Sequence, residues 1–214
     1  MCASAQLSHA QSPIKAGTVA LGGSINYAHN GEAISSSSGG YGSYSSDVSS
    51  NTLALSPSVS YFVADNLSIG LDLSYTVQET SLKYLGSSAT STRKANSLRV
   101  GPFVRYYKML NDQFGFTGTL GAGYQHSSQP SGTSATSQTT LKADGFYTAL
   151  TPGLIFLPIP KLGIGATIGG LGYSRLNMKP EGNNNGNFSD VASTFGASFG
   201  LDQLTFSGTY FFGR

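Results

Sequence analysis

The stretch LSIGLDLSYTVQ, from Leu67 to Gln78, decides the fold. Apolar residues and tyrosine take every second place in it, and Ser, Gly, Asp, Thr and Gln fill the places between. Because successive side chains of a β-strand point to opposite faces, this alternation predicts a strand with one apolar and one polar face.

Similar alternating segments, about 10 residues long, follow one another along the chain. They lie near 17–28, 53–61, 98–107, 114–125, 146–156, 162–173 and 192–212. Short connections are expected at 64–66, 111–113 and 158–161, and long ones at 30–50, 79–96, 126–139 and 174–190. This alternation of short and long connections is typical of outer-membrane barrels. We therefore predict an all-β fold, an eight-stranded antiparallel up-and-down transmembrane β-barrel.

The composition favours the same class. Charged residues make up 10% of the chain and hydrophobic residues 39%, and no apolar run is long enough for a transmembrane helix. A barrel reconciles these values, because half of each strand faces lipid and half faces a polar lumen. The net charge of +2 does not indicate a basic surface that could bind nucleic acid, so no nucleic-acid partner is expected.

The direction of the two faces follows from three charged residues. Asp72, Arg99 and Arg105 fall on the polar side of their strands. A charged side chain that faces lipid has a high free-energy cost, so this side should point inward. A soluble, lipocalin-like barrel would instead turn the apolar side inward, and lipocalins resemble one another through a tryptophan that this chain lacks. We expect the three charges to form a structural ion-pair network in a plugged lumen, with an ion-selective path as the alternative.

Aromatic residues sort into two levels, as lipid headgroup regions favour. One belt, here called the upper belt, lies at the ends of the strands that lead into the long connections. The other, the lower belt, lies near the short connections. The upper belt is Tyr27, Tyr75, Tyr124 and Tyr173, and the lower one is Tyr61, Tyr106, Phe114, Phe156, Tyr210 and Phe212.

Two local features depart from a regular barrel. Pro57, Pro102 and Pro152 occupy equivalent places in three strands, and each should mark a bulge or a lost ladder bond. The alternation also shifts across Gly169-Gly170 and across Asp202-Gln203. We interpret 192–212 as one long bulged strand rather than as two strands joined by a turn at Asp202-Gln203, which would give nine.

Catalytic and metal-binding patterns are weak. The histidines are His9, His29 and His126, and the sequence places no acid to orient His29 or His126. No paired His or Cys spacing predicts a metal site. We therefore expect no enzyme activity, no metal and no cofactor, with a lipid-modifying enzyme as the lesser alternative.

Residues 1–16 are interpreted as a residual signal segment and periplasmic N-terminus, and 17–214 as the barrel. Ala3-Ser4-Ala5 has the small-residue form of a signal-peptidase site. An ordinary disordered N-terminus is the alternative. Cys2, the single cysteine, cannot form an internal disulfide.

The runs SPSVSYFVADNLSIGLDLSY, GPFVRYY and LTFSGTYFF resemble the small outer-membrane β-barrel proteins of the opacity-protein-like type, in their Bacteroidetes form. The resemblance covers most of the chain from Gly17 to Phe212. It implies a location in the outer membrane of a Gram-negative bacterium, and it implies no particular activity. The chain departs from the usual aromatic end, because Gly213-Arg214 follows Phe212.

We expect a non-enzymatic, monomeric barrel that serves surface interaction, adhesion or envelope integrity. Its partners would be outer-membrane lipid, the barrel-assembly machinery during biogenesis, and an extracellular ligand bound through the loops. The segment 30–50, with Tyr41 and Tyr44 among serines and glycines, is the expected adhesive loop, with solvated disorder as the alternative. The second functional class is a small-solute pore.

Overall fold

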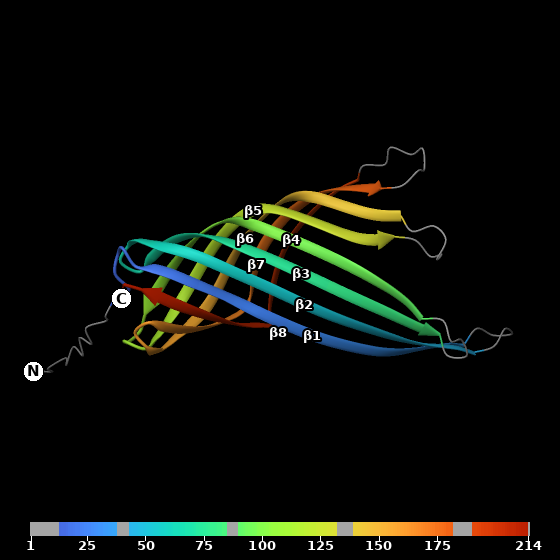
Figure 1. The fold of residues 1–214 in the computed structure, drawn as a ribbon, viewed down its shortest axis with the longest axis horizontal. Coiled ribbons are helices and arrows are strands. Elements are labelled where there is room, and N and C mark those ends of the chain that lie inside the picture. The colour runs from blue at the N-terminus through green and yellow to red at the C-terminus, as the bar shows by residue number, and fades with distance from the viewer. Residues whose placement is uncertain (1–12, 38–42, 85–89, 132–138, 182–189, 214) are drawn as a thin grey trace, which may run out of the picture.

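The chain forms a closed antiparallel barrel of eight strands, which confirms the predicted fold class. The computed structural model describes residues 13–37, 43–84, 90–131, 139–181 and 190–213. Within them, no helix is long and apolar enough to cross a membrane. The strands, drawn in Figure 1, are β1 (Val19–Ser37), β2 (Ser43–Ala64), β3 (Leu67–Tyr84), β4 (Thr90–Met109), β5 (Phe114–Ser131), β6 (Thr139–Ile159), β7 (Leu162–Glu181) and β8 (Asp190–Phe212).

The strands extend well beyond the segments expected from the sequence. The predicted connection 30–50 is mostly a ladder between β1 and β2, which runs from Asn30↔Ser50 to Ser37↔Ser43. The other long connections at 79–96, 126–139 and 174–190 are likewise partly strand. The prediction of long connections was wrong here. Ser, Thr, Asn and Gly occupy both faces of these strand ends, so the sequence no longer alternates between apolar and polar residues. Tyr44 lies in β2, and Tyr41 lies outside the described residues.

The apolar side of the sheet points outward, as the sequence predicts. Leu71 and Leu73 on β3 are 58% and 41% exposed, whereas Asp72 between them is partly buried. The same pattern holds on β4, where Val104 is exposed and Phe103 is buried. Around the middle of the barrel, the outer wall is therefore a continuous apolar belt, whereas the inner face at that level holds polar side chains.

The three prolines at equivalent places, Pro57, Pro102 and Pro152, interrupt the ladder, as predicted. Pairing between β2 and β3 skips Pro57, and pairing between β4 and β5 skips Pro102. At Pro152 the register between β6 and β7 shifts. Each proline keeps a partner on its other side, so each one weakens a single seam of the ring.

A large bulge bends β8, and it confirms the interpretation as one strand. Ile168 of β7 pairs with Leu204, but the next residue, Gly169, pairs with Phe199. The segment 200–203 is thus inserted into β8. Gly169 has a φ of 100°, a conformation that glycine adopts without steric cost. The two parity shifts seen in the sequence therefore lie opposite one another.

The ring divides at the end far from the short turns. Pairing of β1 with β8 covers only five residue pairs, from Val19↔Phe212 to Gly23↔Gly208. Pairing of β4 with β5 stops at Asn96↔Ser128, so the upper parts of these strands also separate. Figure 1 shows the strand tips diverging there into two groups. We call β1–β4 the first half and β5–β8 the second half.

An apolar layer fills the barrel at the opposite end. Phe62 of β2, Tyr107 of β4 and Phe211 of β8 are almost fully buried, with ring centroids 5.3–6.4 Å apart. Ile14 reaches the same layer from the segment before β1. Its backbone N–H donates to Asn66 Oδ1 at 2.9 Å, and its carbonyl accepts from the Asn66 N–H at 2.8 Å. The complete layer, here called the plug, is Ile14, Ala20, Phe62, Tyr107, Met109, Ile155, Leu157 and Phe211.

Candidate functional sites

A polar cavity of about 240 Å³ lies inside the barrel. At roughly 30 Å³ for each molecule of liquid water, it is large enough for several waters. All eight strands contribute to its wall, and most of the lining residues are small Ser, Thr and Gly. The larger lining side chains are Asp72, Phe103, Arg105 and Tyr147.

Tyr147 connects two of the predicted lumen charges. Its hydroxyl donates to Asp72 Oδ2 at 3.3 Å, across the barrel from β6 to β3. The guanidinium of Arg99 lies over the Tyr147 ring, 5.4 Å from the centroid. The sequence analysis did not single out Tyr147. Alternation next to the outward Phe146 could have shown that Tyr147 points inward. Its contact with Asp72 could not have been predicted in this way, because β6 and β3 are not neighbouring strands.

Arg105 is held by groups of the first and second halves. Its Nε–H donates to Thr119 Oγ1 of β5 at 2.8 Å, and its guanidinium lies 4.9 Å from the Phe103 ring centroid. Asp72 forms no direct salt bridge with either arginine in the part of the chain that the structure describes. The structure thus places the three predicted charges on the inner face of the sheet. Tyr147 links Asp72 with Arg99, whereas Arg105 is bound to Thr119 and the Phe103 ring.

The plug lies directly beyond this cavity on the same strands. Tyr107 follows Arg105 by two residues, and Phe211 follows Thr209 by two residues, so both point to the same side as the cavity lining. Large buried rings thus replace small polar side chains toward the short turns.

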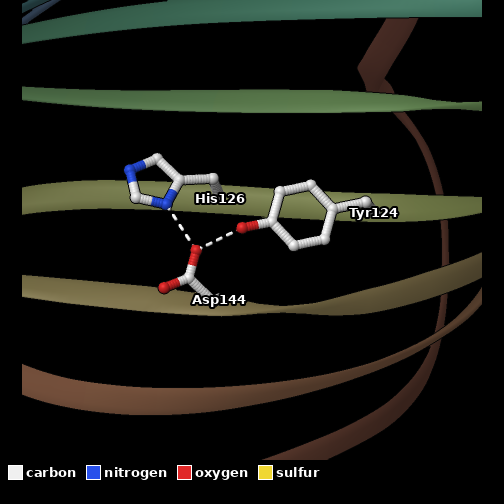
Figure 2. Close-up of polar contacts among 3 residues, drawn as sticks. All are labelled: Tyr124, His126 and Asp144. Carbon is white, nitrogen blue, oxygen red and sulfur yellow. Dashed lines mark hydrogen bonds and ion pairs between the residues drawn. The ribbon is translucent and has the colours of Figure 1, made fainter.

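A second group of polar side chains lies on the outer surface of the second half. His126 Nδ1 is 2.6 Å from Asp144 Oδ1, and the Tyr124 hydroxyl donates to the same oxygen. Figure 2 shows the phenol and the imidazole, both from β5, converging on the carboxylate from β6. The expectation that no acid orients His126 was therefore wrong. Asp144 could have been found only from the register that sets it opposite His126.

The first half carries a neutral counterpart of this group. Tyr27 and His29 have the same Tyr-X-His spacing as Tyr124 and His126, and both approach Oδ1 of Asn51 on β2. The His29 Nδ1 distance is 2.6 Å, and the tyrosine hydroxyl distance is 3.3 Å. Within the described residues, no serine or threonine hydroxyl forms a hydrogen bond with the His126 ring. No group of three His, Cys, Asp or Glu side chains there could hold a metal ion.

The aromatic residues of the two predicted belts lie on the outer face. Near the short turns, Phe114 and Phe156 stack at 4.6 Å, and Tyr210 and Phe212 meet edge to face at 4.8 Å. At the other level, Tyr173 lies 6.1 Å from Phe146. The remaining members of both belts are exposed in the isolated barrel, namely Tyr27, Tyr75, Tyr124, Tyr61 and Tyr106.

A solved structure shares this architecture. The crystal structure of the outer membrane protein OprG from Pseudomonas aeruginosa matches with a TM-score of 0.51 over 94% of this chain and 98% of that chain. The sequence identity is 14%, so the likeness shows the fold and nothing finer. No protein-family model matches the chain. No curated protein sequence matches it either.

Proposed function

We propose that this chain is a non-conducting, non-enzymatic barrel of the outer membrane of a Gram-negative bacterium. Its continuous apolar outer wall supports the membrane location, since soluble monomers rarely expose such a surface. The shared fold with an outer membrane protein supports the same placement. The finer assignment, to the opacity-protein-like barrels of the Bacteroidetes type, rests on the sequence resemblance.

The plug is the observation that carries the non-conducting role. Its rings come from both halves of the barrel and leave Phe62 and Phe211 fully buried. Barrels of eight strands have interiors only wide enough for side chains, so one packed layer is sufficient to block ion flow.

Planar-bilayer recording of the refolded protein tests this role. Wild-type protein should insert without steady single-channel steps. A Phe62→Ala/Phe211→Ala variant should conduct more, because it removes two rings of the plug. Phe206→Ala, on the outer face of β8, is the matched control and should stay silent. Steady steps from the wild type would contradict the proposal.

The physiological role that we propose is surface interaction, adhesion or envelope integrity. The connections at the far end would contact an extracellular ligand, and the barrel itself would contact lipid and, during biogenesis, the assembly machinery. We propose a single-chain barrel with no nucleic-acid partner. Binding of purified protein to intact cells or host matrix should fall when the connections at 38–42, 85–89, 132–138 and 182–189 are replaced by short turns.

A small-solute pore is the second candidate, and the polar cavity favours it. The conductance experiment separates the two functions. Catalysis has less support, because no serine or threonine hydroxyl among the described residues forms a hydrogen bond with the His126 ring. Incubation with phospholipid or lipopolysaccharide, followed by mass spectrometry, should therefore show no new product.

A further inference from the structure

The polar cavity inside the barrel keeps an acid and a base apart. Asp72 and Arg105 both line it, but Tyr147 donates to Asp72 Oδ2, and Thr119 accepts from Arg105 Nε. Asp72 interacts electrostatically with Arg105, yet the two form no direct salt bridge in the described part of the chain. A carboxylate has two acceptor oxygens and a guanidinium has five N–H donors, so each group has hydrogen-bonding capacity left. Both groups are therefore held in place with that capacity at the cavity wall.

The opposite wall of the cavity carries hydroxyl groups. They belong to β6, β7 and β8, and they are Thr151, Thr167, Thr205, Ser207 and Thr209. Among the residues that the structure describes, none of these hydroxyls forms a hydrogen bond. A hydroxyl both donates and accepts, so this wall suits an occupant that carries donors and acceptors alike.

Gly121 leaves the centre of the cavity open. It lies on β5 between Phe103 of β4 and Ala149 of β6. A Cβ atom added there would lie 3.7 Å from the Phe103 Cβ, an ordinary contact distance, and Gly121 has no positive φ. At Gly70, also on the inner face, an added Cβ would instead clash with the Val59 carbonyl oxygen. Because glycine weakens a strand and can mark the close approach of a ligand, its presence at position 121 indicates space for an occupant.

Tyr107 provides a further polar group at the floor of the cavity. Its side chain is 1% exposed, and its hydroxyl has no hydrogen-bond partner among the described residues. A hollow of about 40 Å³ beside it shares Arg105 and Thr119 with the cavity wall. A hydroxyl buried so completely needs a partner, and the hollow has room for one water-sized group.

Size and access limit what the cavity can hold. Its volume of about 240 Å³ corresponds to roughly eight water molecules at about 30 Å³ each. The plug closes it toward the short turns, whereas the pairing of β1 with β8 ends at Gly23, level with the cavity. A small solute therefore enters from the far end, where the halves separate, and stops at the plug.

We propose that the cavity binds a small polyol, which carries a hydroxyl on each carbon of a short chain. Such hydroxyls donate to Asp72, accept from Arg105 and do either with the Ser and Thr side chains opposite. They also reproduce the hydrogen bonds of the waters that they displace. The Phe103 and Tyr147 rings offer apolar faces to the carbon chain. Most of the wall is uncharged, which favours a neutral polyol over a zwitterion of similar size.

NMR titration of the folded barrel with erythritol, a polyol with a short carbon chain, tests the proposal. The protein would be refolded in a detergent without a sugar or polyol headgroup. Signals of Thr167 and Thr205 should shift and reach saturation, whereas those of Phe195, at the far end of β8, should stay in place. Butane-1,4-diol lacks the inner hydroxyls of erythritol and should bind at least about tenfold more weakly, because hydrogen bonds are lost.

Two variants test the site itself. Gly121→Val should raise the Kd for erythritol more than about tenfold, because the new side chain fills the cavity and valine suits a strand. Thr167→Val/Thr205→Val keeps the shape of the wall, removes two of its hydroxyls and should raise the Kd about tenfold. The matched control is Gly118→Val on the outer side of β5, where nothing lies within 4 Å of an added Cβ. It should keep the wild-type Kd, and urea unfolding would check that each variant is folded.

Several results would overturn the proposal. They are the absence of saturable shifts at Thr167 and Thr205, equal binding of butane-1,4-diol, and a wild-type Kd in the folded variants of the site. Tighter binding of aminobutyrate would overturn the polyol as the class of ligand. The conductance experiment stays separate from these outcomes. Steady single-channel steps contradict the proposed function alone, and a silent barrel that binds no erythritol contradicts this inference alone.

Discussion

The two halves of the barrel have similar strands and different chemistry. Each half places a Tyr-X-His pair on its outer face, but the first half turns it toward the amide of Asn51 and the second toward the carboxylate of Asp144. Cross-strand charges are of opposite sign in the first half and of like sign on β6 and β7. The two halves thus repeat one outer arrangement with an uncharged acceptor in the first half and a carboxylate in the second.

The contact between the two halves is closer at one end of the barrel than at the other. Near the short turns they share the plug and the β1–β8 pairing, whereas at the far end both β1/β8 and β4/β5 part. Between these levels, Asp72 of the first half contacts Tyr147 of the second. Contacts between the halves therefore weaken from the plug upward, and the following substitutions test that order.

Removal of a plug ring should have the largest effect. Phe211→Ala deletes a fully buried ring between Phe62 and Tyr107, and such substitutions cost about 3–5 kcal/mol. Urea unfolding of the refolded barrel would measure the loss. Phe195→Ala at the far end of β8, 76% exposed, should change the unfolding free energy by less than about 1 kcal/mol. Similar losses for both would show that the plug does not join the halves.

Cysteine pairs should locate the point at which the halves separate. In a Cys2→Ser background, Leu21→Cys/Tyr210→Cys should form a disulfide, because these residues face one another across β1 and β8. Ile25→Cys/Phe206→Cys should remain reduced, although continuing the same register would pair them. Gel mobility with and without reductant gives the answer. Unpaired backbone groups are costly in hydrocarbon, so a disulfide at the second pair would show that the bilayer closes the ring further.

Loss of a lumen contact should have an intermediate effect. Arg105→Leu removes the hydrogen bond from β4 to Thr119 on β5, and it leaves Asp72 with one fewer cation nearby. We expect a loss of about 1–2 kcal/mol in the unfolding free energy. Tyr147→Phe removes only the hydroxyl that reaches Asp72, so its loss should be smaller. An unchanged urea midpoint for Arg105→Leu would rule out a structural role for this arginine.

Exchange of the two outer acceptors should have the smallest effect on stability. Asp144→Asn makes the second half resemble the first, and Asn51→Asp does the reverse. Because these groups are partly exposed to solvent, each change should alter the unfolding free energy by less than about 1 kcal/mol. The NMR signals of the His126 ring should nevertheless move in Asp144→Asn, because the oxygen 2.6 Å from its Nδ1 then belongs to an amide. Unchanged ring signals in Asp144→Asn would contradict the hydrogen bond between these two side chains.

The sequence predicted the parts of the fold that depend on local contrast. Leu67–Gln78 identifies its two faces by alternation alone, and the parity shifts at Gly169 and Asp202 located the bulge of β8. The strand ends were not predictable in this way, because serine-rich ladders such as Ser43–Ser50 have no apolar side to count. The contacts of Tyr147 and Asp144 depend on register and on the curvature of the ring, which no local pattern contains.

The short pairing of β1 with β8 has a consequence for the order of folding. Each hairpin joins residues that are close along the chain, but Val19 meets Phe212 only after nearly the whole polypeptide is in place. Contacts between such distant residues have the highest closure entropy and tend to form late. The step that converts a curved sheet into a ring is therefore the last available one, and until then β1 and β8 both remain open to a foreign strand.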